Sequence, residues 1–129
     1  MTTQTTRIEY GETDSFRKDL KRLLKKYRTL EEDLKTVKRS AIELYHLNKI
    51  DSRSIFPIPG FCTKEIQICK IKKFTCKALK GKGAQSGIRI IYAFHTTISK
   101  VVFIEMYFKA DQENENTLRI NEYLKTNNL

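Results

Sequence analysis

The chain has 129 residues, a mass of 15.2 kDa and a formal net charge of +10. This length suits one core, and 40% hydrophobic residues with few Gly and Pro exclude a disordered or repeat protein. The start of the chain lacks a signal-peptide apolar core, and no segment reaches the roughly 18 apolar residues of a membrane span, so a cytoplasmic protein is expected. We expect a single domain over residues 1–129, with residues 1–6 disordered.

A short strand at Arg7–Tyr10 is predicted to precede two amphipathic helices. The first helix begins near Asp14, and its apolar residues recur at spacings of three and four. These residues are Phe16, Leu20, Leu23, Leu24 and Tyr27. Thr29, three residues before Glu32, predicts a capping box that opens the second helix. The apolar stripe of that helix consists of Leu30, Leu34, Val37, Ala41, Leu44 and Leu47.

Extended structure is predicted after the second helix. Pro57 and Pro59 end the helical part, because proline biases the residue before it toward extended geometry. Residues 63–77 alternate imperfectly between apolar and polar positions. This pattern predicts a bulge, or a turn between two strands, near Lys72 and Lys73.

Two apolar strands and a short helix complete the predicted elements. The strands are expected at Ile88–Phe94 and Val101–Lys109, and the helix at Asn116–Lys125. The whole order predicts an α+β fold, in which a two-helix hairpin packs on one face of an antiparallel sheet and a short helix follows.

The alternation of the two apolar strands predicts which side chains face the helices. One set on each strand is expected to do so: Ile88, Ile90, Tyr92 and Phe94 with Val102, Ile104, Met106 and Phe108. If Phe94 pairs with Val102, then Arg89 lies opposite Tyr107. Arg89, Tyr107 and Lys109 would then share the helix-free face of the sheet.

Positive charge is concentrated in the strand-forming middle of the chain. Residues 61–109 hold 10 basic and 2 acidic side chains, whereas residues 110–129 hold 2 basic and 4 acidic ones. Such a field favours nucleic acid, an acidic membrane surface or an acidic protein as partner. The glycines of GKGAQSG, residues 81–87, allow a phosphate to approach the backbone, although a flexible hairpin loop is the alternative. No Walker motif is present.

Simpler roles remain open for the same residues. Arg89 can pair with Glu105 on the neighbouring strand, and Tyr107 can be a sheet-packing residue. The three cysteines, seven residues apart, match no zinc pattern and are expected to be free and mostly buried. The two histidines, His46 and His95, are too far apart in the predicted fold to form a metal or acid/base pair. Neither a metal nor a cofactor is expected.

The run KALKGKGAQSGIRIIYAF, followed by VVFIEMYFKADQEN, resembles the signature of the RelE/ParE superfamily of toxin–antitoxin toxins, in particular its RelE- and HigB-like branch. That signature has a lysine and glycine loop, then Gly-x-Arg-x-Ile-Tyr on a strand, then an apolar strand that ends near Tyr-x-Lys. The helical hairpin before it is also typical, so the resemblance covers about residues 7–125. An acidic helix-like tail stands where many relatives have a C-terminal strand.

The resemblance implies a metal-independent mRNA endoribonuclease that acts on ribosome-bound mRNA and is neutralised by a small acidic or helix-turn-helix antitoxin. By position in the motif, it implies four catalytic residues: Arg89, Tyr107, Lys109 and Lys82. Four more lysines are expected to bind RNA: Lys77, Lys80, Lys72 and Lys70. Two other functions stay open, which are a ParE-like DNA gyrase inhibitor and a non-catalytic basic RNA-binding domain.

Overall fold

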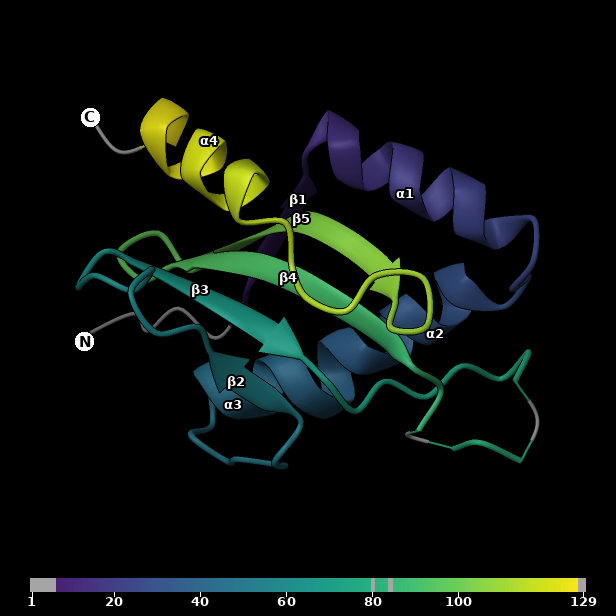
Figure 1. Ribbon diagram of the computed structural model, residues 1–129. Helices are drawn as coiled ribbons and strands as arrows, with labels where there is room; N and C mark the ends of the chain where they lie inside the picture. The colour runs from purple at the N-terminus through teal and green to yellow at the C-terminus, as the bar shows by residue number, and fades with distance from the viewer. Residues whose placement is uncertain (1–6, 80, 84, 128–129) are drawn as a thin grey trace.

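A five-stranded sheet forms the centre of the molecule (Figure 1). The computed structural model describes residues 7–79, 81–83 and 85–127. The strands, in chain order, are β1 (Glu9–Glu12), β2 (Ile55–Pro57), β3 (Ile66–Ile71), β4 (Ile88–His95) and β5 (Lys100–Phe108). In space their order is β1-β5-β4-β3-β2, with β1 parallel to β5 and every other pair antiparallel.

The helices lie close to their expected positions. They are α1 (Asp14–Leu24), α2 (Leu30–Val37), the π-helical η1 (Lys38–Glu43), α3 (Leu44–His46) and α4 (Thr117–Asn127). Thr13 caps α1, because its Oγ1 accepts a hydrogen bond from the Phe16 amide at 3.1 Å. The expected capping box at Thr29 is wrong, since Thr29 Oγ1 instead donates to Asp33 Oδ2 at 2.7 Å. Within the residues described, no helix is long and apolar enough to cross a membrane.

Both faces of the sheet are covered, and each has its own core. The first core packs α1, α2 and η1 against one face and includes Phe16, Leu23, Leu30, Leu34, Ile42, Ile90, Tyr92 and Phe103. The second packs α4 against the other face and includes Ile58, Ile68, Ile91, Ala93, Ile104, Tyr107 and Ile120. Figure 1 shows α2 and α3 on one side of the sheet and α4 on the other. The α+β prediction is confirmed, but the face expected to be free of helices carries α4.

The pairing of β4 with β5 is half as predicted. Arg89 lies opposite Tyr107, as expected, but the register shifts after Ile91, so that Phe94 pairs with Val101 and not with Val102. The shift is a β-bulge, which places one unpaired residue in β5. The expectation that Val102 faces the helices is therefore wrong.

The bulge falls at Ile104, between the pairs Ile91 with Glu105 and Tyr92 with Phe103. On either side of it, Phe103 and Met106 both pack in the first core, whereas Ile104 belongs to the second. Strict alternation cannot produce this arrangement, because the arrangement requires the successive side chains of Ile104 and Glu105 to lie on the same face. The sequence prediction placed Ile104 on the wrong face for this reason.

The segment before β4 also differs from the prediction. β3 ends at Ile71 with no second strand directly after it, and the short edge strand β2 at Ile55–Pro57 was not predicted. Pro57 removes a backbone donor, which an edge strand tolerates. The expected strand at Arg7–Tyr10 is confirmed with a shift of two residues, since β1 spans Glu9–Glu12.

A buried carboxylate links three elements. Asp19 of α1 is 2% exposed, and its two oxygens accept from Arg119 Nη1 at 2.6 Å and Nη2 at 3.1 Å. The Met106 amide of β5 donates to the same carboxylate at 3.1 Å. Asp19 therefore ties α1, β5 and α4 together, with geometry typical of a bidentate arginine pair.

We expect Asp19→Asn to lower the free energy of unfolding by roughly 3 kcal/mol, because it breaks a buried ion pair and leaves the guanidinium of Arg119 without its partner. Urea unfolding followed by circular dichroism measures this. Arg22→Ala is the matched control: its exposed guanidinium reaches Asp19 only at 3.5 Å, and its loss should cost less than about 0.5 kcal/mol. Equal costs for the two variants would contradict the assignment.

Candidate functional site

Arg89 lies on the α4-side face of the sheet, at the start of β4. Its side chain is partly exposed, and its Nη1 donates to the Lys72 carbonyl at 2.8 Å, just past the end of β3. On its other side, Tyr107 of β5 is its direct pairing partner. Since the carbonyl uses one of the five guanidinium N–H donors, the planar group keeps a fork that suits a phosphate.

A second row of side chains crosses the same face one pleat away. Lys70 pairs with Phe56 of β2 on one side and with Ile91 on the other. Its ammonium forms an ion pair with Glu115 Oε1 at 2.5 Å, and the two side chains are only 13% and 16% exposed. Burial lowers the pKa of Lys70, but Glu115 and the nearby Tyr107 together raise this pKa by more than burial lowers it. The pKa of Lys70 therefore lies above its ordinary value. Lys70 is therefore a fixed cation and not a general base.

A small pocket opens beside this ion pair. It has a volume of ≈ 120 Å³ and is lined by Phe56, Pro57, Ile58, Pro59, Lys70, Lys72 and Glu115. Lys72 is exposed and places its ammonium 4.8 Å from the centre of the Phe56 ring, a cation–π contact. Two lysines and an aromatic ring thus surround this pocket, and the carbonyl of one of them, Lys72, accepts the hydrogen bond from Arg89.

Tyr107 is far more buried than a base-stacking residue on an open face would be. It is 2% exposed and packs in the second core with Ile91 and Ile120. Among the described residues, its hydroxyl has no hydrogen-bond partner. Burial raises the pKa of Tyr107, and the Lys70 ammonium opposes this effect. The expected shared open face is wrong for Tyr107, because α4 and the segment before it cover the phenol.

The alternative pair between Arg89 and Glu105 does not form. Glu105 is 1% exposed and accepts hydrogen bonds from Gln112 Nε2 at 2.7 Å and from the Asn116 amide at 2.9 Å. Arg89 is bonded to the Lys72 carbonyl instead. The buried Glu105 therefore holds the segment between β5 and α4, which leaves the arginine outside that network.

The remaining predicted lysines lie around the site. Lys109 is exposed just after β5, where its amide donates to the Gly87 carbonyl at 2.8 Å. Lys77 and Lys82 are exposed on the segment between β3 and β4. The Lys77 amide donates to Asp33 Oδ2 at 3.2 Å, which anchors this segment to α2. In the described part of the chain, no hydrogen bond or ion pair joins either of these two lysines to Arg89, and Lys80 lies outside the described residues.

The glycine that ends this loop has a strict steric role. Gly87 has a φ of +85°, and a Cβ on it would lie 2.9 Å from Cε1 of Phe108. Next to it, Ser86 Oγ donates to the Phe74 carbonyl at 2.5 Å. These two contacts fix the C-terminal end of the loop. They therefore also fix the start of β4, where Arg89 lies.

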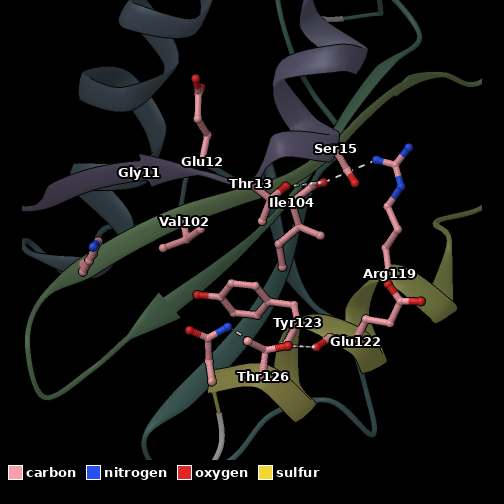
Figure 2. Close-up of a pocket in the computed structure, with 12 residues that line it drawn as sticks. Gly11, Glu12, Thr13, Ser15, Val102, Ile104, Arg119, Glu122, Tyr123 and Thr126 are labelled. Carbon is pink, nitrogen blue, oxygen red and sulfur yellow. Dashed lines mark hydrogen bonds between the residues drawn. The ribbon is translucent and has the colours of Figure 1, made fainter.

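A larger cavity lies on the same side of the sheet, between the start of α1 and α4 (Figure 2). Its volume is ≈ 470 Å³, and its charged lining mixes Glu12 and Glu122 with Lys100 and Arg119. The guanidinium of Arg119 is already bonded to Asp19. This balance of charge does not suit a phosphodiester, whereas Arg89 and the lysines near it do.

The histidines and cysteines have structural surroundings. His46 Nε2 lies 2.7 Å from Tyr92 Oη inside the first core, and burial, assisted by Lys49, lowers the pKa of His46 to about 4. His95 Nε2 lies 2.5 Å from Tyr123 Oη. Two cysteines are buried and one is exposed, all three free. Over residues 7–79, 81–83 and 85–127, no three His, Cys, Asp or Glu residues are grouped as metal ligands.

Glu115 is the residue at the site that sequence reasoning missed. A usable signal was present, because residues 110–129 carry a net charge of −2 directly after a stretch of +8. Opposite charges that are adjacent in sequence can fold back on each other. Which acidic residue does so depends on the turn geometry after β5, which the charge pattern does not contain.

No protein-family model matches the chain, and no curated protein matches it significantly. Among solved structures, it is similar to the archaeal RelE–RelB complex from Pyrococcus horikoshii OT3, with 13% identity and a TM-score of 0.48 over 79% of this chain and 94% of that one. It is also similar to a conserved hypothetical protein from Helicobacter pylori, with 19% identity and a TM-score of 0.49 over 81% and 98% of the two chains. Both likenesses concern architecture alone.

We expect Tyr107→Phe to leave the free energy of unfolding within about 0.5 kcal/mol of the unmodified protein, because the buried hydroxyl has no hydrogen bond to lose. Tyr92→Phe is the control, since it removes the hydroxyl bonded to His46 and should cost about 1 kcal/mol or more. Urea unfolding measures both. A large cost at Tyr107 would mean that its hydroxyl is bonded after all.

Proposed function

We propose that this protein is the toxin of a toxin–antitoxin pair and cleaves ribosome-bound mRNA without a metal ion. The observation that carries the proposal is the position of Arg89, which lies on the cationic side of the sheet with Lys72 on one flank and Tyr107 on the other. The concentration of basic residues in 61–109 supports a polyanionic substrate. The sequence motif that contains Arg89 supports the choice of RNA cleavage.

The reaction that suits this site is an attack within the RNA itself. The 2′-oxygen of a ribose attacks the adjacent phosphorus and gives up its proton to a base, while the bond from phosphorus to the 5′-oxygen breaks and that oxygen takes a proton. The products are a 2′,3′-cyclic phosphate and a 5′-hydroxyl. Arg89 would stabilise the charge on the pentavalent phosphorus in the transition state. We assign the proton transfers to the group of Tyr107, Lys109 and Lys82.

Binding of the flanking phosphates falls to the lysines around the site. Lys70 and Lys72 border the small pocket near the end of β3, where the Lys72 carbonyl accepts from Arg89, and the exposed Lys77 extends the positive charge onto the loop. Lys80 belongs to the same set by its place in the sequence. Phosphate contacts of this kind position RNA without reading its sequence, so codon choice would come from the ribosome. A small acidic or helix-turn-helix protein is the expected antitoxin.

We expect Arg89→Ala to reduce mRNA cleavage by about 100-fold or more, because it removes the main cation at the transition state. The assay maps new 5′ ends on a defined mRNA bound to purified ribosomes. Lys64→Ala is the matched control: it also removes one exposed positive charge, but near the opposite end of β3 from Lys72. Cleavage by this control should be unchanged.

Each rival function has its own outcome in the same set of measurements. An intact mRNA with wild-type protein on ribosomes rules out the nuclease. RNA binding without cleavage would then indicate a non-catalytic RNA-binding domain. DNA cleavage complexes formed by gyrase in the presence of the protein would indicate a ParE-like inhibitor instead.

Binding to single-stranded RNA should weaken steeply with salt, because each neutralised phosphate releases counterions. We expect Lys72→Ala to reduce the slope of log affinity against log salt by about 0.7, the value for one phosphate contact on a single strand. Fluorescence anisotropy at several salt concentrations measures the slopes. Lys64→Ala should leave the slope unchanged, and a flat response of the wild-type protein would contradict a phosphate-led interface.

A further inference from the structure

An acidic segment of the chain lies over the cationic site. Residues 109–116 connect β5 to α4, and Glu115 in this segment pairs with Lys70. Lys70 and, more weakly, Lys72 lower the pKa of Glu115 against the opposing effect of burial, so that the carboxylate is charged. A negative group of this chain therefore occupies the position where the proposed substrate would place one.

The segment is held in this position by specific bonds. Glu105, buried in β5, accepts from Gln112 near the middle of the segment and from the Asn116 amide at its end. Gln112 Nε2 also donates to the Asn114 carbonyl at 2.8 Å. The buried carboxylate of Glu105 thus fixes the segment at two points. This holds Glu115 in contact with Lys70.

The carboxylate leaves part of this position unsatisfied. Glu115 Oε1 lies 2.5 Å from Lys70 Nζ without forming a hydrogen bond of regular geometry, and the buried hydroxyl of the neighbouring Tyr107 forms none either among the described residues. A phosphate carries more acceptor oxygens than a carboxylate. It can accept from the Lys70 ammonium with one oxygen and from the Tyr107 hydroxyl with another.

We propose that Lys70 and the Tyr107 hydroxyl form a phosphate position, which Glu115 fills in the unliganded protein, so that residues 109–116 act as an internal gate that RNA must displace. This inference rests on the proposed function, because it takes RNA as the ligand of the same face. Glu115 is a regulatory residue here and makes no contact with the reacting phosphate. Glu105 is a positioning residue that keeps the gate closed.

The gate predicts a definite cost in affinity. When only a fraction of the molecules is open, the apparent dissociation constant rises by the inverse of that fraction. Removing the charge of Glu115 should therefore tighten RNA binding even though the substitution adds no contact to RNA. An ordinary surface carboxylate affects binding only through its long-range charge, which salt screens.

The test compares Glu115→Gln with Glu113→Gln in the full-length chain. The two variants change the net charge equally, and Glu113 is exposed in the same segment. The probe is a short fluorescein-labelled single-stranded RNA, and the readout is anisotropy. We expect Glu115→Gln to bind about tenfold more tightly than the wild type, and Glu113→Gln to stay within about twofold of it.

Two further variants check that the gain comes from the phosphate position. Adding Lys70→Gln or Tyr107→Phe to Glu115→Gln should remove most of the gain. Urea unfolding of all variants confirms that they are folded at the assay temperature. The gate is overturned if Glu115→Gln and Glu113→Gln bind alike, or if the gain persists without Lys70.

The gate and the nuclease can fail separately. Tighter binding by Glu115→Gln without cleavage by any variant would support the gate and refute the nuclease. Cleavage by the wild type with no effect of Glu115→Gln on binding would refute the gate and leave the nuclease. If neither the wild type nor Glu115→Gln binds the RNA, the phosphate position itself is wrong.

Discussion

The bulge at Ile104 is the constraint on which the rest of the structure depends. A regular β5 would place every second side chain on one face, but the bulge gives two successive residues, Ile104 and Glu105, to the α4 side. Phe103 and Met106 can then both pack in the first core. Ile104 packs against α4, and Glu105 accepts a hydrogen bond from the segment that leads to α4. One inserted residue thus serves both cores and the candidate site.

The two faces of the sheet have different roles, one in stability and the other in the candidate site. The first core carries most of the large apolar side chains and a buried His46–Tyr92 contact, so its role is stability. The other face mixes apolar packing with Arg89, Lys70 and Lys72, which is costly for stability unless each charge is paired or reaches solvent. Arg89 reaches the rim and Lys70 is paired with Glu115. The ion pair between Lys70 and Glu115 offsets the cost of burying each charge alone. In the proposed gate, the same ion pair also closes the site.

The site residues differed in how far the sequence could predict them. Arg89 and its opposition to Tyr107 followed from motif and alternation, and the register at that end of the strands is as expected. The burial of Tyr107 did not follow, because it depends on α4 crossing the face. Lys70 was expected to bind phosphate, but its partner Glu115 lies 45 positions further along the chain. Pairing over such a distance is decided by how the chain returns, which local patterns do not encode.

The sequence alone determined the element types, the apolar stripes of α1 and α2, the two long strands and the concentration of positive charge. These follow from periodicity and composition, which act over a few residues at a time. Tertiary structure alone decided the bulge, the cover provided by α4, the Asp19–Arg119 pair and the contact of Glu115 with Lys70. Each of these joins segments distant in the chain, so each depends on the packing of the complete fold.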